Sequence, residues 1–199
     1  MTKTLYLMRH GQTLFNVQER IQGWCDSPLK KEGEEQAKMA RAFFDGEGIQ
    51  FDRLYSSTSE RASDTLELAS GRTDYQRLKG LKEWNFGRME GQQEYLHPNR
   101  RPDQQSHEDF YLLYDGDGEE EIQSRISQAI SGIFQEMKEG QTALAVSHAG
   151  ALMQFFLTLR LEKYPELHFS NCCIFQYELT DHDLSLVRII DPIAGKIYQ

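Results

Sequence analysis

The regular alternation of strand-like and helix-like segments is the feature that most constrains the fold of this chain of 199 residues. Strands are predicted at residues 4–8, 51–56, 142–146, 174–179 and 184–190. Apolar side chains at helical spacing predict helices over residues 33–45, 60–69, 118–138 and 151–159. In the third of these helices, apolar residues recur every four positions from Ile122 to Phe134. Strand–helix alternation of this kind favours a parallel sheet covered by helices.

We therefore predict an α/β fold: a three-layer sandwich with a mainly parallel central sheet flanked by helices, formed as one domain over residues 1–199. Right-handed crossovers place the carboxyl ends of parallel strands at one edge of the sheet, where ligands bind. Residues 9–11, 56–61 and 147–150 directly follow predicted strands. We expect these three segments to meet at that edge.

One segment, from about residue 91 to 117, fits no periodic pattern. It contains Pro98 and Pro102, a polar run that includes Arg100 and Arg101, and an aromatic patch around Phe110. It is long for a plain connection, and we expect it to be a lid-like insert over the site. The two arginines could bind an anionic tail of a substrate, or they could be solvated loop charges.

Composition excludes several classes of protein. A net charge of −9 disfavours a general nucleic-acid binder, which needs a basic face. No apolar run approaches the length of a membrane span, and the apolar stretch at the N-terminus is too short for a signal peptide, so we expect a cytoplasmic protein without a membrane partner. Cys25, Cys172 and Cys173 are odd in number and lack zinc-ligand spacing, and they suggest no disulfide framework.

Two histidines and two arginines fall at the predicted sheet edge: Arg9, His10, Arg61 and His148. Alone, each has a plain structural explanation, because a histidine at a strand end is often just hydrogen-bonded and an arginine is usually a solvated charge. Their convergence on one predicted edge is what indicates a functional site there.

Motifs that contain these residues extend in order along almost the whole chain. They are Arg9-His10-Gly11-Gln12-Thr13 with Asn16, Arg20, Gly23-Trp24 and Asp26; Ser56-Ser57 with Arg61-Ala62 and Thr65; Leu81, Glu83, Phe86-Gly87 and Glu90-Gly91; Gly118-Glu119 with Arg125; and Val146-Ser147-His148-Ala149-Gly150. In this combination they resemble the histidine phosphatase (phosphoglycerate mutase-like) superfamily. Only the segment between residues 91 and 117 is left unmatched.

The resemblance implies a role for each matched residue. His10 would be the nucleophile that becomes a phosphohistidine, and Glu83 the general acid that protonates the leaving group and later activates water. Arg9, Arg61 and His148 would stabilise the phosphoryl oxygens. Further phosphate contacts would come from Asn16, Gln22, Gly23 and Ala149. Asn16 could instead be a loop-capping amide, and Glu83 a surface glutamate. Glu90 is interpreted as structural, and His97 and His107 are assigned no chemistry.

No cofactor or metal is expected, because the matched site is rich in arginine rather than in clustered carboxylates. The predicted activity is that of a phosphatase acting on a small phosphorylated metabolite. The alternative is a phosphoglycerate mutase-type phosphotransferase, although Glu83 is followed here by Trp84-Asn85-Phe86-Gly87 instead of the histidine-tyrosine-glycine segment usual in those mutases. A third possibility, of another class, is a non-catalytic member that binds a phosphorylated ligand or a partner.

Overall fold

The computed structural model describes residues 2–97, 99, 107–160, 169–181 and 183–198. Seven strands form one sheet: β1 Lys3–Arg9, β2 Arg53–Ser57, β3 Gln76–Leu78, β4 Thr142–Ser147, β5 Ile174–Thr180, β6 Asp183–Asp191 and β7 Lys196–Tyr198. The α-helices are α1 Leu14–Val17, α2 Lys31–Gly46, α3 Glu60–Ser70, α4 Glu119–Glu136 and α5 Ala149–Thr158. Short 3-10 turns are η1 Lys79–Leu81, η2 Gly87–Met89, η3 Glu94–Leu96 and η4 Phe110–Tyr114.

The strand order in the sheet is β3-β2-β4-β1-β5-β6-β7. The β3–β2, β2–β4 and β4–β1 pairs are parallel, whereas β5, β6 and β7 extend the sheet from β1 by antiparallel pairing. The parallel half is the part built from strand–helix units. Its carboxyl ends form the edge at which the predicted site residues lie.

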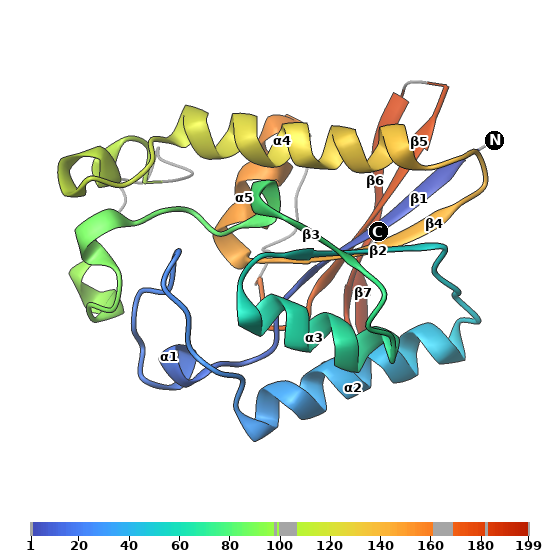
Figure 1. The fold of residues 1–199 in the computed structure, drawn as a ribbon, viewed down its shortest axis with the longest axis horizontal. Helices are drawn as coiled ribbons and strands as arrows, with labels where there is room; N and C mark the ends of the chain where they lie inside the picture. Colours follow the sequence, from blue (N-terminus) through green and yellow to red (C-terminus); the bar gives the residue numbers. More distant parts are fainter. Residues whose placement is uncertain (1, 98, 100–106, 161–168, 182, 199) are drawn as a thin grey trace.

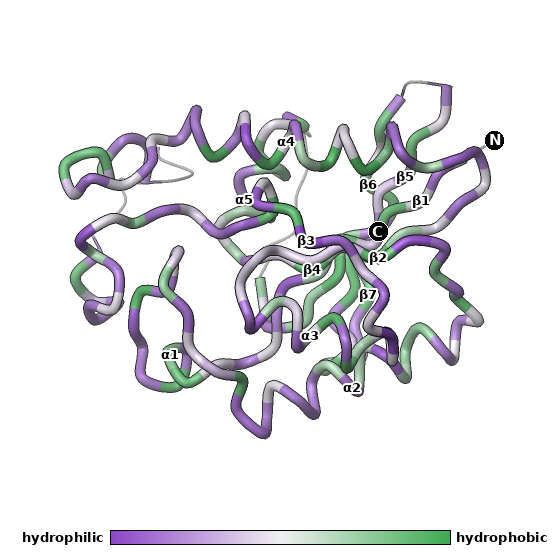
Figure 2. The backbone as a smooth tube through the Cα atoms, in the orientation of Figure 1, coloured by the Kyte–Doolittle hydropathy of each residue, from purple (hydrophilic) through white to green (hydrophobic). Residues whose placement is uncertain are grey.

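Helices cover both faces of this sheet, with α4 and α5 on one face and α2 and α3 on the other (Figure 1). Side chains of β1 contribute to the hydrophobic cores on both faces of the sheet, because successive side chains of a strand point to opposite faces. Leu5 and Leu7 pack with the core beneath α4 and α5, whereas Tyr6 and Met8 pack with the core beneath α2 and α3. Along the central strands the tube in Figure 2 is largely hydrophobic, as expected for strands buried on both faces.

The predicted three-layer α/β sandwich is confirmed. The strands predicted at residues 4–8, 142–146 and 174–179 correspond to β1, β4 and β5, with ends that differ by a residue. Strands β3 and β7 were not predicted from the sequence, because each has only three residues, lies mostly at the surface and carries no buried apolar run. Cys25, Cys172 and Cys173 are free, as expected.

The aperiodic segment predicted as a lid is described only in part, and Arg100, Arg101, Pro98 and Pro102 lie outside the described residues. Its described ends form η3 and η4. Tyr111 in η4 is fully buried and packs edge-on against Trp84 and Phe86, which follow the proposed acid Glu83. This part of the segment is therefore fixed to the Glu83 loop, while a lid role stays a prediction. Among the described residues, no helix is long and apolar enough to cross a membrane.

Candidate active site

The carboxyl ends of β1 and β4 bring the two predicted histidines together. Arg9 is paired with Ser147 in the parallel register of these strands, so His10 and His148 each follow directly after a paired residue. Their ring centroids lie 5.2 Å apart, and both side chains are buried. The sequence places these residues 138 positions apart (148 − 10), and only the parallel pairing of β1 with β4 explains their contact.

The hydrogen bond of His10 fixes the tautomer of its imidazole. Nδ1 lies 2.7 Å from the carbonyl oxygen of Gly11. A carbonyl only accepts, so Nδ1 carries the proton and Nε2 keeps its lone pair. Burial, reinforced by the positive charges of Arg61 and Arg9, holds the pKa of His10 well below its ordinary value. The ring is therefore neutral near pH 7, with Nε2 as its nucleophilic atom.

The His148 side chain is held by a hydrogen bond to the end of β2. Its Nε2 lies 2.8 Å from Oγ of Ser57, the last residue of that strand. Its Nδ1 is buried and has no hydrogen-bond partner within the described part of the chain. Burial and the nearby charge of Arg61 hold the pKa of His148 well below its ordinary value. An unpartnered buried ring nitrogen beside a second imidazole is a position at which an oxyanion could bind.

Arg61, in the first turn of α3, is the largest fully buried side chain described. Nη1 donates to the Cys25 carbonyl and to Oδ1 of Asp26, and Nη2 donates to the Gly23 carbonyl. These bonds use three of the five N–H groups of a guanidinium. The Nε–H, which has no partner among the described residues, and one Nη2–H remain on one edge of the group. That edge can bind two oxygens of a phosphoryl group.

Arg9, the last residue of β1, is half-buried and directly precedes His10. Its Nη1 donates to the Phe169 carbonyl, and its Nε is buried without a partner in the described residues. Burial lowers the pKa of the Arg9 guanidinium, but an arginine keeps its charge in a protein. The site thus holds two guanidinium cations, one of which, Arg61, is paired with Asp26 at 2.8 Å.

Glu83 is buried, with 5% of its surface exposed, so it is not a surface glutamate. Its Oε1 accepts from the backbone N–H groups of Trp84 and Ala151, and its Oε2 accepts from that of Gly150. Two of these three donors lie in the first turn of α5, directly after His148. A Cβ at Gly150 would lie 2.6 Å from Oε1, so only glycine admits this approach. The start of α5 therefore positions the carboxyl group and the second histidine together.

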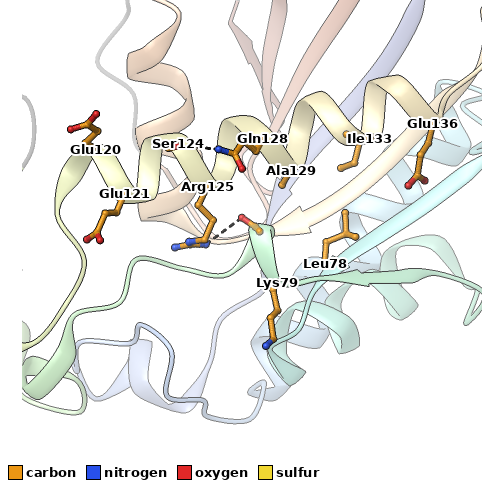
Figure 3. Close-up of a pocket in the computed structure, with 12 residues that line it drawn as sticks. Leu78, Lys79, Glu120, Glu121, Ser124, Arg125, Gln128, Ala129, Ile133 and Glu136 are labelled. Carbon is orange, nitrogen blue, oxygen red and sulfur yellow. Dashed lines mark hydrogen bonds between the residues drawn. The ribbon is translucent and has the colours of Figure 1, made fainter.

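Arg125, which the sequence analysis matched to a motif without assigning a role, anchors the loop that carries Glu83. From α4, its Nη1 donates to the carbonyl of Gly80 (Figure 3). Nη1 also donates to the carbonyl of Lys82, and Nη2 donates to the carbonyl of Glu83. A groove of about 740 Å³ runs between α4 and η1 on the outer side of this anchor. Neither histidine of the site lines it.

Of the remaining predicted phosphate ligands, Asn16, Gln22 and Gly23 lie in the loop after β1, and much of their hydrogen-bonding capacity is used internally. Asn16 forms a capping box with Thr13 at the start of α1, so the capping role that the sequence left open is present. The side chain of Gln22 bridges Thr13 and Ser27 at 2.7 and 2.9 Å. Gly23 presents its carbonyl to Arg61. Ala149 is the first residue of α5.

Glu90 was interpreted as structural, and its contacts agree. Its carboxylate accepts from the backbone N–H groups of Trp24, Cys25 and Phe86, which joins the Arg61-binding loop to the Glu83 loop. In the described residues, no group of three or more histidine, cysteine or acidic side chains could hold a metal ion.

Comparison with known proteins places this arrangement in a family. The model of the histidine phosphatase superfamily (branch 1) matches residues 5–192. The chain belongs to this superfamily. Every residue of the candidate site lies inside the matched range.

Proteins similar to this chain include some that are named as mutases and others that are named as phosphatases. A 2,3-bisphosphoglycerate-dependent phosphoglycerate mutase of Nitrosococcus oceani is 34% identical over 92 residues, which is 44% of this chain and only 38% of that protein. The crystal structure of a phosphoglycerate mutase from Bacillus anthracis superposes with a TM-score of 0.82 at 26% identity, covering 94% of this chain and 92% of the other. A phosphoserine phosphatase from Entamoeba histolytica, in complex with 3-phosphoglyceric acid, gives 0.75 at 25% identity, with 94% and 96% covered.

Proposed function

We propose that this protein is a phosphatase that hydrolyses a small phosphate monoester through a phosphohistidine on His10. The observation that carries the proposal is the tautomer of His10. Its Nδ1–H donates to the Gly11 carbonyl, which leaves a lone pair on Nε2 of a neutral ring whose centroid lies 5.2 Å from that of His148. A neutral imidazole with a free lone pair is what nucleophilic attack on phosphorus requires.

In the first step, Nε2 of His10 forms a bond to phosphorus while the ester P–O bond breaks. Arg9, Arg61 and Nδ1 of His148 bind the phosphoryl oxygens, on which the negative charge lies in the transition state. The departing alkoxide takes a proton from Glu83. We assign this proton to Oε2, because Oε2 accepts one backbone hydrogen bond whereas Oε1 accepts two.

In the second step, the Glu83 carboxylate takes a proton from water, whose oxygen attacks the phosphorus of the phosphohistidine. The P–N bond breaks, inorganic phosphate leaves, and Nε2 of His10 recovers its lone pair. Glu83 has then regained its proton, so both residues have returned to their starting states. No metal ion or cofactor takes part in this scheme.

A second candidate is transfer of the phosphoryl group to another hydroxyl of a bound substrate, as in a mutase. The names of the Nitrosococcus oceani relative and of the Bacillus anthracis structure favour it. Both candidates use the same phosphohistidine and differ only in the acceptor. Whether water or a substrate hydroxyl accepts the phosphoryl group depends on which of them binds next to the phosphohistidine. The histidines and arginines of the site are therefore compatible with either reaction.

The test measures where the phosphoryl group goes. The purified protein is incubated with an aryl phosphate and with phosphoglycerate, and released inorganic phosphate is compared with the isomerised phosphoglycerate. A phosphatase releases one phosphate for each ester consumed and forms little isomer. Isomer formed much faster than phosphate would establish the mutase instead, and absence of turnover on a panel of phosphorylated metabolites would indicate a non-catalytic binding protein.

A further inference from the structure

A side chain outside all the motifs of the sequence analysis links the nucleophile to the loop after β1. Asn171, located just before β5, donates through Nδ2 to the His10 carbonyl at 3.1 Å and to Oδ1 of Asn16 at 3.3 Å. It lies 161 positions from the first partner and 155 from the second. The side chain is half-buried, and its amide joins the start of the loop after β1, at His10, to Asn16 further along the same loop.

The chemistry of these three groups leaves one arrangement. The carbonyl of His10 can only accept, so Asn171 must present its NH₂ group rather than its oxygen. The second hydrogen of that NH₂ group points to Asn16, which must therefore present an acceptor. The backbone N–H of Thr13 donates to the same Oδ1 of Asn16 at 3.1 Å. Two N–H donors on one atom fix that atom as oxygen.

It follows that the amide nitrogen of Asn16 is the atom left for a ligand. Among the described residues, the hydrogen bonds of the Asn16 side chain all end on Oδ1. The Thr13 hydroxyl has a single proton, and Oε1 of Gln22 at 2.7 Å is a closer acceptor for it than Oδ1 of Asn16 at 3.1 Å. Asn16 therefore relies on Asn171 and on the Thr13 backbone to hold its amide in one orientation.

We infer that Asn171 is a positioning residue that orients the Asn16 amide so that its Nδ2 donates to a phosphoryl oxygen of the substrate. The inference rests on the proposed function, in which a phosphoryl group binds at His10, and on the expectation from the family resemblance that Asn16 contacts that group. Asn171 does not touch the substrate in this account. It acts through Asn16, and it also restrains the His10 carbonyl.

The backbone around Asn171 supports the same conclusion. The Phe169 carbonyl accepts from Arg9, and the N–H of Cys172 donates to the His10 carbonyl at 3.4 Å. Cys172 has a φ of +58°, a left-handed conformation uncommon for a residue with a side chain, which turns the chain back toward the nucleophile. The segment from Phe169 to Cys172 thus contacts Arg9, His10 and Asn16.

Replacement of the Asn171 side chain tests the inference. Asn171→Ala should weaken binding of inorganic phosphate roughly 10-fold, because a hydrogen bond to a charged group loses its fixed donor. Asn171→Asp should weaken it more, because a carboxylate cannot donate and draws the Asn16 NH₂ away from the ligand. Unchanged phosphate binding in both folded variants would overturn the inference.

A matched control and a double-mutant cycle separate positioning from general stability. Ser170→Ala removes the neighbouring hydrogen bond to Asp191, of 2.9 Å, without touching the active-site loop, and should leave phosphate binding unchanged. In an Asn16→Ala background, Asn171→Ala should weaken phosphate binding several-fold less than it does alone. Full multiplication of the two effects would show that Asn171 does not act through Asn16.

One further variant tests the inference even if the proteins with substitutions at Asn171 do not fold. Asn16→Asp keeps both accepting contacts and replaces only the free Nδ2 with oxygen, so it should fold normally and lose phosphate binding. Normal phosphate binding by Asn16→Asp would overturn the inference. A wild-type protein that neither binds phosphate nor turns over phosphomonoesters would contradict the proposed function itself, a result distinct from an active enzyme indifferent to changes at Asn171.

Discussion

At the scale of single residues, the site is defined by which atoms are already hydrogen-bonded and which are free. Within the described parts of the chain, His10 uses Nδ1 in a hydrogen bond and leaves Nε2 without a partner, and Arg61 uses three of its N–H groups and leaves one edge without a partner. Glu83 is fixed by three backbone donors. Placement of this kind is what allows an enzyme to stabilise developing charge without reorganising at the moment of reaction.

The proposed acid role of Glu83 predicts that the effect of a mutation there depends on the leaving group. Glu83→Gln keeps the size of the side chain but removes the transferable proton, so the rate should fall roughly 10²–10⁴-fold for alkyl phosphates, the contribution typical of general acid catalysis. It should fall much less for aryl phosphates with acidic leaving groups, which depart without protonation. Steady-state rates over a series of leaving groups measure this. Equal slowing across the series would remove Glu83 from the acid role.

At the scale of elements, the active-site loop is packed against the first turn of α2. A Cβ at Gly33 would lie 2.1 Å from the Gln12 carbonyl oxygen, and one at Gly11 would lie 2.5 Å from the Gly33 carbonyl oxygen. The two backbones touch because neither residue has a side chain. Helix α2 therefore sets the position of the residues that follow His10.

This contact predicts a coupled loss of stability and activity. Gly33→Ala should destabilise the protein by about 1–3 kcal/mol, because an added methyl group has no space, and should lower kcat by displacing the His10 loop. Gly132 in α4 has nothing within 4 Å of its Cβ position and serves as the control. Gly132→Ala should be neutral or stabilising by up to about 1 kcal/mol. Chemical denaturation and kinetics on both variants check this, and a Gly33→Ala protein as stable and active as wild type would contradict it.

Periodicity predicted the elements with buried apolar faces and missed those without one. The core residues of α2 to α5 could be predicted because apolar side chains, such as Ala37 in α2 and Ile126 in α4, occur at helical spacing. Strands β3 and β7 were not, because they are short and add to sheet edges. The site histidines and arginines were predicted from strand ends and family motifs. Asn171 was not, since its role depends on a hydrogen bond across 161 positions that no local pattern records.

At the scale of the whole molecule, the fold places three histidines in environments that lower their pKa values. Burial holds the pKa of His10 and of His148 well below the ordinary value of 6.5. Burial and the nearby His107 lower the pKa of His97 to about 4. His97 also lies 2.6 Å from the Tyr111 hydroxyl, in the aromatic cluster that fixes η4 to the Glu83 loop.

These depressed pKa values predict a loss of stability in acid. Below pH 6.5 the unfolded chain takes up protons that the folded chain does not, so the free energy of unfolding should fall as the pH drops from about 6.5 toward 4. His97→Gln, which keeps an acceptor for Tyr111, should show a shallower fall in Tm over that window and a similar Tm at pH 7.5. The prediction fails if the wild type and the variant lose the same Tm between pH 6.5 and 4.

The most direct test of the phosphohistidine mechanism is to trap the intermediate. The protein is mixed with a phosphorylated substrate, quenched in alkali within the first turnover, and digested for mass spectrometry of the peptide that contains His10. The mechanism predicts an acid-labile phosphoryl group on His10 of the wild type, and none on the His10→Ala variant, which should also lose turnover. Phosphoryl transfer that persists in His10→Ala, or a label on His148 instead, would contradict it.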